Sequence, residues 1–182
     1  MTARGLVNSI MGSIVLFAIV RRTIFHAVVC GKSMLPTLGP GTHLIVYRCN
    51  GGLFSTSRFH PIRRGDVLAI ERSSKLHPPL LKRLIGLPGD SIRISDGSLY
   101  INGSRVKEPY IADQPNYMYP CNRSARTLGI DEFFVLGDNR NASDDSHLFG
   151  PIKKEKIIGK AWLIIGPWPK MKVMSCQSYA TL

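Results

Sequence analysis

Three separated segments of the chain carry side chains that could take part in a reaction. Ser33 lies in residues 29–38, which are mostly small or apolar. Lys82 follows Pro78-Pro-Leu-Leu81 and precedes Leu84 and Ile85, so it is a basic residue inside an apolar strand. A serine hydroxyl becomes a good nucleophile once a base takes its proton. A lysine inside an apolar strand either extends its amine to solvent or has a desolvated amine. The third segment, residues 137–147, is polar and by itself predicts no more than a turn.

The elements that would hold these segments are short strands. Asp96-Gly97 joins two of the apolar runs, and this dipeptide is a strong hairpin signal because both turn positions need a positive φ. Asn102-Gly103 marks a further turn. Beyond the first thirty residues no long stretch has a helical period, so we expect a mainly β fold, an antiparallel sheet or barrel-like domain carrying one N-terminal helix. The predicted strands cover residues 42–47, 66–70, 91–95, 98–102, 133–136 and 160–165, with excursions at 50–61 and 109–128.

The amino end has the composition of a membrane segment. Residues 5–20 carry no charge, and Arg21 and Arg22 follow them. Sixteen helical residues span about 24 Å, less than the roughly 30 Å of a bilayer core, so the helix must continue through the two arginines to cross it. We expect residues 1–28 to form a membrane anchor and residues 29–182 a β-rich domain. A cleavable signal peptide and a buried core helix are the alternatives, and the flanking charges do not set an orientation.

The net charge and the positions of the cysteines limit which partners, metals and cofactors we expect. Lys and Arg number 24 against 12 Asp and Glu, a net charge of +12 that attracts anionic lipid or nucleic acid. No strand alternates basic and aromatic residues as base-stacking sheets do, so we expect no nucleic-acid partner. We also expect no metal and no cofactor, because the cysteines form no C-x-x-C pair and the histidines do not cluster beside them. The sequence does not show whether any of the four cysteines pair: Cys30, Cys49, Cys121 and Cys176.

Four segments together resemble the boxes of the type I signal peptidases, membrane-bound proteases that use a serine and a lysine. The family pattern S-M-x-P-T-L matches residues 33–38, and R-G-D-V matches residues 64–67. The pattern K-R-x-I-G-L-P-G-D matches residues 82–90, and G-D-N-R-x-x-S-x-D-S matches residues 137–146. The order and spacing of the four segments also agree with the family, and the resemblance covers about residues 22–169. The residues of the motifs are more similar to bacterial than to mitochondrial members.

The resemblance implies that Ser33 is the nucleophile and Lys82 the general base, with Ser143 holding the lysine amine by a hydrogen bond. For this role the lysine must be neutral near pH 7, whereas its reference pKa is about 10.4. Burial against apolar groups can lower the pKa by the necessary amount. The sequence-local candidates for that surrounding are Leu81, Leu84 and Ile85.

The resemblance further implies an ion pair that supports the site, and two positions of this chain differ from the family pattern. An ion pair between Arg83 and Asp145 is expected, with Asp138 close by. Gly31 stands where many relatives have a serine that helps to stabilise the oxyanion, so backbone N–H groups would carry more of that task and turnover could suffer. His147 stands where the family often has arginine, and we expect it to be structural rather than catalytic, able to pair with Asp145.

The resemblance implies a substrate and a location as well. Family substrates are exported preproteins cleaved after small residues at −3 and −1, and Val29, Leu81 and Met34 are expected to line the pockets for them. We expect a single-pass membrane protein, in the inner membrane of a bacterial cell with the catalytic domain on the trans side. Basic residues near an anionic leaflet would add about 1 kcal/mol each.

Other functions compete with this one. A specialised relative, such as an organellar inner-membrane peptidase or a pilin or conjugation maturase, would share the same boxes. A self-cleaving repressor would need a DNA-binding domain for which the chain lacks room. A basic nucleic-acid-binding β-domain is suggested only by the charge. An inactive scaffold is disfavoured because all of the reactive positions are intact.

Overall fold

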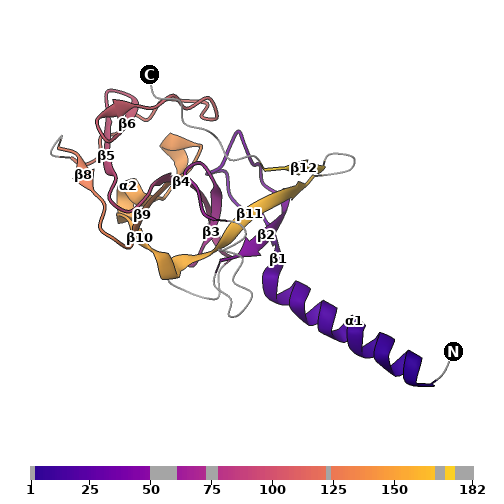
Figure 1. The fold of residues 1–182 in the computed structure, drawn as a ribbon. Coiled ribbons are helices and arrows are strands. Elements are labelled where there is room, and N and C mark those ends of the chain that lie inside the picture. Colours follow the sequence, from indigo (N-terminus) through magenta and orange to yellow (C-terminus); the bar gives the residue numbers. More distant parts are fainter. Residues whose placement is uncertain (1–2, 50–60, 73–77, 122–123, 167–170, 175–182) are drawn as a thin grey trace.

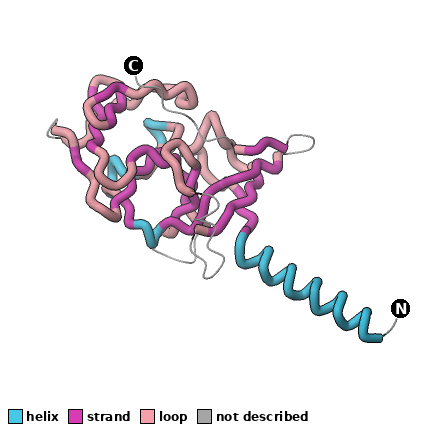
Figure 2. Tube along the Cα trace, viewed as in Figure 1, coloured by secondary structure: helices cyan, strands magenta, loops and turns pink. Residues whose placement is uncertain are grey.

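A single helix projects from a β-rich body (Figure 1). The computed structural model describes residues 3–49, 61–72, 78–121, 124–166 and 171–174. The body contains two antiparallel sheets, and loops make up much of its remainder (Figure 2). The prediction of a mainly β fold with one N-terminal helix is confirmed. Except for Pro61, the expected excursion at 50–61 lies outside the described residues.

The helix α1, Ala3–Thr23, continues through Arg21 and Arg22. Its 21 residues span about 31 Å, close to the thickness of a bilayer core. Within the described residues it is the one helix long and apolar enough to cross a membrane, and its apolar stretch is not buried against the rest of the structure. Strand β1, Ile24–Val28, follows without a break, so the residues expected at the end of the anchor belong to the sheet.

The large sheet brings distant parts of the chain together. Its strand order is β1-β2-β11-β3-β4-β9-β10, and β12 also pairs with β11. The late strand β11 therefore lies between two early ones, and β4, which carries Lys82, lies between β3 and β9. The strands after β1 are β2 (His43–Arg48), β3 (Val67–Ile70), β4 (Leu80–Gly86), β9 (Glu132–Leu136), β10 (Ile152–Lys153), β11 (Ile157–Ile165) and β12 (Met171–Val173).

The small sheet has the order β7-β6-β5-β8. Asp96 and Gly97 have φ values of 51° and 70°, which confirms the predicted hairpin. The stretch 109–128 is not a complete excursion as predicted, because its end forms β8 and Tyr119 bridges to Ile94. The strands are β5 (Ser91–Ser95), β6 (Ser98–Ile101), β7 (Ser104–Arg105) and β8 (Arg126–Thr127).

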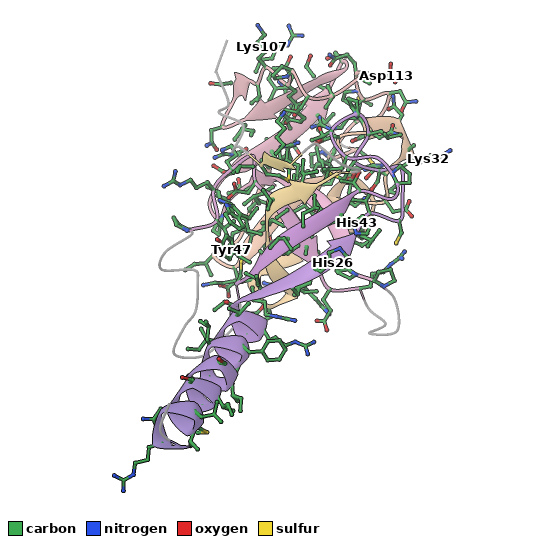
Figure 3. The ribbon with its side chains drawn as sticks, turned by 90° about the vertical axis from the view of Figure 1, so that its right-hand side faces the viewer. His26, Lys32, His43, Tyr47, Lys107 and Asp113 are labelled. Atoms are coloured by element: carbon green, nitrogen blue, oxygen red, sulfur yellow. The ribbon has the colours of Figure 1, made fainter. Side chains whose placement is uncertain are left out.

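Three apolar clusters fill the body, and the one beside β1 and β2 matters most for the site. It contains Val29, Met34 and Leu38 from the loop that joins those strands, together with Leu81 of β4. This packing attaches the loop to the sheet. On the exposed part of β1 and β2, His26 and His43 lie side by side with a ring hydrogen bond of 2.8 Å (Figure 3). In the described part of the chain there are also three short helices: η3 (Arg140–Ala142), α2 (Ser146–Phe149) and η4 (Lys154–Lys156).

Candidate active site

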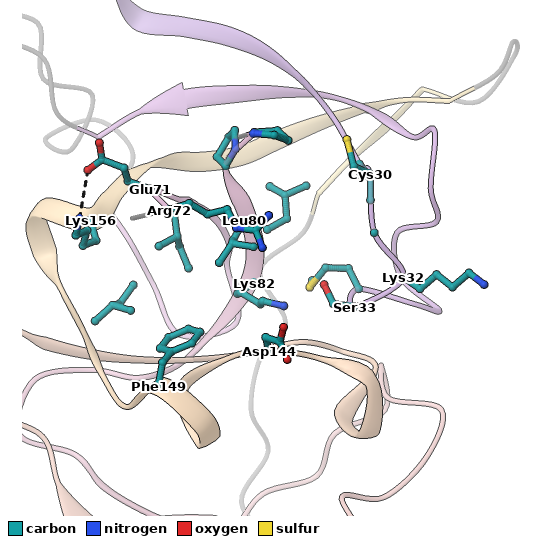
Figure 4. A pocket seen from close by; sticks show the side chains of 18 of the residues that line it. Cys30, Lys32, Ser33, Glu71, Arg72, Leu80, Lys82, Asp144, Phe149 and Lys156 are labelled. Carbon is teal, nitrogen blue, oxygen red and sulfur yellow. Dashed lines mark ion pairs between the residues drawn. The ribbon is translucent and has the colours of Figure 1, made fainter. Parts of the chain in front are cut away.

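Ser33 lies in the tight loop between β1 and β2. The buried side chains of Met34 and Leu38 hold this loop against the sheet, and Leu38 N donates to Met34 O at 2.8 Å. The backbone N–H of Asn139 donates to the carbonyl of Ser33 at 3.0 Å, which joins the loop to the polar segment after β9. Ser33 itself is half-buried and lines a cavity (Figure 4).

Lys82 is almost completely buried in the middle of β4. Its side chain is 2% exposed, and its Nζ donates to Ser143 Oγ at 2.8 Å, the hydrogen bond that the resemblance implied. Burial lowers the pKa of Lys82 below its ordinary value of 10.5. The carboxylates of Asp145 and Asp144 oppose this shift, and the charge of Arg72 adds to it. The amine is therefore shifted toward the neutral form that a general base needs.

One cavity of about 940 Å³ has both Ser33 and Lys82 in its wall. Figure 4 shows their side chains in the same hollow, with Asp144 beside the lysine. Among the hydrogen bonds of the described residues, none joins Lys82 Nζ directly to Ser33 Oγ. The amine donates its hydrogen bond to Ser143 Oγ instead. Catalytic hydrogen bonds of this kind often tighten only when substrate is bound, so this arrangement remains compatible with proton transfer.

The expected ion pair between Arg83 and Asp145 is wrong. Arg83 instead binds Asp138 through two hydrogen bonds, from Nε at 2.7 Å and from the terminal nitrogen at 2.5 Å, and both side chains are buried. Its other terminal nitrogen donates to Gly65 O at 2.7 Å. The physical reason is the alternation of side chains along a strand: neighbouring residues Lys82 and Arg83 point to opposite faces of β4, and Asp145 acts on the lysine.

Asp145 has other partners. One oxygen accepts from the N–H of Gly137 at 2.8 Å, and the other contacts His147 Nδ1 at 2.7 Å. His147 in turn stacks on Tyr117 with ring centroids 3.9 Å apart. His147 thus pairs with Asp145, as the sequence suggested it could, and Asp145 also caps α2 by accepting from the His147 N–H.

Gly137 is a residue of this site that sequence reasoning passed over. A Cβ at this position would collide with Ser143 Oγ and with the backbone oxygen of Ser33. Only glycine lets the segment after β9 approach the serine loop so closely. Its place at the start of the fourth family box was the available signal, but its packing role depends on contacts far apart in sequence.

A second buried ion pair was also missed. Arg140 binds Glu108 through two hydrogen bonds of 2.6 Å, and both side chains are nearly inaccessible. The ring of Tyr110 lies between this pair and the first one, 4.2 Å from the guanidinium of Arg83 and 5.9 Å from that of Arg140. Glu108 lies outside all four boxes, so no local pattern indicated it.

The backbone around Ser33 leaves room for an oxyanion. No hydrogen bond in the described part of the chain uses the N–H of Ser33, so that donor can point at a developing negative charge. Gly31 is exposed, and a Cβ added there would meet nothing within 4 Å. A serine at position 31 would therefore fit without moving its neighbours.

The expected pocket residues meet at the same cavity. Val29, Met34 and Leu81 all line it, and each is at most 8% exposed. Their side chains therefore give the cavity an apolar part of its wall. Within the described residues no group of three His, Cys, Asp or Glu side chains could hold a metal ion. Cys30 and Cys121 are free thiols, and Cys176 lies outside the described residues.

Comparison with known proteins identifies one family. The sequence profile of the family described as Signal peptidase, peptidase S26, matches residues 3–168. The chain is 34% identical to a probable signal peptidase I-2 of Synechocystis sp., over 79% of this chain and 64% of that relative. It is 32% identical to a signal peptidase I of Bacillus licheniformis, over 91% of this chain and 90% of the relative.

A solved structure of a signal peptidase I from Enterococcus faecalis V583 is also similar. It is 33% identical with a TM-score of 0.46, and the match covers 56% of this chain and 97% of that one. The chain spans less than two thirds of the length of the Synechocystis relative but nine tenths of the Bacillus licheniformis relative.

Proposed function

The chain belongs to the signal peptidase family, peptidase S26, and on that premise we propose that it is a membrane-anchored serine endopeptidase that removes signal peptides from exported preproteins. The observation that carries this proposal is the buried amine of Lys82. It is held by Ser143, has a lowered pKa and shares its cavity with Ser33. A lysine buried in this way is costly for stability, and a role as general base accounts for it.

In the first step Ser33 Oγ attacks the scissile carbonyl carbon while neutral Lys82 takes the hydroxyl proton. The carbonyl oxygen becomes an oxyanion, which the N–H of Ser33 is free to stabilise. Ser143 holds the amine by the hydrogen bond at 2.8 Å and fixes its direction. The pair of Arg83 and Asp138 braces the far side of β4 and the segment that carries Ser143.

The intermediate then collapses. The C–N bond breaks, the ammonium of Lys82 gives its proton to the leaving amine, and the mature protein departs with a free amino terminus. An ester between Ser33 and the signal peptide remains. The amine of Lys82, neutral again, takes a proton from a water molecule that attacks this ester. The signal peptide leaves as a carboxylic acid, and Ser33 recovers its proton from the lysine.

The cavity wall beside Ser33 and Lys82 bears on the choice of substrate, and the helix α1 bears on the location of the protein. Val29, Met34 and Leu81 form the apolar floor that selects small side chains at −3 and −1. The helix α1 anchors the protein in a membrane, proposed to be the inner membrane of a bacterial cell with the catalytic body on the trans side. In this arrangement the domain division stays close to the predicted one, with an anchor that ends at Thr23 rather than 28.

Cleavage of a preprotein tests this function. The detergent-solubilised full chain would be incubated with a labelled preprotein and with the same preprotein carrying Leu at −1, and the new amino terminus would be determined. We expect cleavage directly after the small residue at −1, and loss of that product with Leu. Absence of cleavage, or cleavage at an unrelated bond that ignores the −1 substitution, would contradict the proposal.

A further inference from the structure

Arg72 is a cationic residue in the wall of the active-site cavity to which the reaction above gives no role. It follows β3 by two positions and is exposed. In the view of Figure 4, the side chain of Arg72 lies beside Leu80, above Lys82. The apolar side chains of Ile70 and Leu80 also line the cavity. A peptide that follows this groove past the lysine would therefore meet the guanidinium.

Arg72 also differs from the other cations that line the cavity. Lys156 forms an ion pair with Glu71 at 3.7 Å, and the side chain of Lys32 points away from the hollow in Figure 4. Lys82 is the buried amine already described. No hydrogen bond or ion pair within the described residues engages Arg72. Its charge nevertheless reaches the amine of Lys82, whose pKa it lowers further.

We propose that Arg72 binds a carboxylate of the substrate, so that preproteins with Glu or Asp close to the cleaved bond are preferred. This inference rests on the proposed function and adds a specificity residue to it. An arginine presents a planar fork of donors that matches a carboxylate with two hydrogen bonds. A substrate acid at this point would supply the counter-charge that no described side chain provides, and a substrate lysine there would be repelled.

The expected preference is modest because the site is open to solvent. Exposed ion pairs change affinities by about two- to fivefold, so a comparable change in kcat/KM is expected for a single acidic substitution. The preference should also weaken with added salt, since screening reduces the interaction between exposed charges. The dependence on position is sharper, because successive residues of an extended peptide are about 3.3 Å apart and alternate in direction.

A glutamate scan of the substrate tests the proposal. Matched peptides would carry Glu, Gln or Lys at each position on both sides of the cleaved bond except −3 and −1. The readout is the Glu-to-Gln ratio of kcat/KM for the full chain. We expect a ratio of about two to five at one position, a ratio near one for Arg72→Gln, and a preference for Lys over Gln at that position for Arg72→Glu.

Lys32→Gln is the matched control, because it removes the same charge from a side chain that points away from the cavity. It should keep the ratio of the natural protein. A ratio that is flat along the substrate, or one that Lys32→Gln abolishes as fully as Arg72→Gln, would overturn this inference alone. Failure of the natural protein to cleave even the Gln peptides would overturn the proposed function as well.

Discussion

At the scale of single residues, the burial of Lys82 has a cost that can be measured. Its pKa is lower in the folded than in the unfolded chain, chiefly because of burial. Between those two pKa values the unfolded chain binds the additional proton, so this contribution to stability rises with pH toward 10.5 and is lost as pH falls through the folded value. The burial of Lys82 thus both lowers the pKa of the base and lowers the free energy of unfolding.

Lys82→Met removes that cost together with the base. We expect preprotein cleavage to fall by about 10⁴- to 10⁶-fold, as in other serine proteases that lose a catalytic member. We also expect the variant to unfold at higher denaturant concentration than the natural protein at pH 7, with the difference shrinking as pH approaches 10.5. Denaturation curves at several pH values measure this. Restored cleavage by the Met variant at high pH would show that Lys82 is not the base.

Gly31 gives a prediction about the oxyanion. A hydroxyl placed there has space, since nothing lies within 4 Å of an added Cβ. If it reaches the developing charge, Gly31→Ser should raise kcat by roughly tenfold, less than the 10²–10³ that removal of one donor costs in another protease. Gly31→Ala is the matched control and should not raise kcat. Steady-state rates that are equal for the two variants would mean that the serine does not reach the oxyanion.

At the scale of elements, the buried pair of Arg83 and Asp138 connects β4 to the segment that follows β9. Removal of one partner from such a pair leaves an uncompensated buried charge. We expect Asp138→Ala to lower the free energy of unfolding by about 3–5 kcal/mol and to disturb the placement of Ser143. The double variant Arg83→Met with Asp138→Leu should recover part of that loss. Urea unfolding measures both, and an Asp138→Ala variant of natural stability would contradict the connecting role.

Some elements could be predicted from the sequence and others could not. The Asp96-Gly97 turn predicts its own hairpin, because its backbone requirement is local. The sequence places the residues of β1 in the anchor, because no helix-breaking residue separates them from α1. Only their pairing with β2 makes them a strand. The boxes predict that Ser33, Lys82 and Ser143 belong to one site; in the structure Ser33 and Lys82 line one cavity, and Lys82 donates a hydrogen bond to Ser143. They did not distinguish Asp138 from Asp145 as the partner of Arg83, because that choice depends on which face of β4 each side chain takes.

At the scale of the whole molecule, the helix and the body are separable. The spanning part of α1 is not buried against the body, while the loop with Ser33 is held by the core beside β1 and β2. Deletion of residues 1–23 should therefore leave a folded body. We expect the truncated protein to lose flotation with vesicles but to keep cleavage of a short soluble peptide within about tenfold. Loss of cooperative unfolding after truncation would show that α1 also stabilises the body.

In the proposed reaction the hydroxyl of Ser33 carries out the attack. This role is tested by the rate of preprotein cleavage by Ser33→Ala, measured beside the natural protein and beside Ser13→Ala, which changes an exposed serine of α1. If Ser33 is the nucleophile, we expect no mature product from Ser33→Ala above about 10⁻⁴ of the natural rate, an unchanged unfolding curve, and full activity of Ser13→Ala. Mature product of the same amino terminus, formed by purified Ser33→Ala at the natural rate, would contradict it.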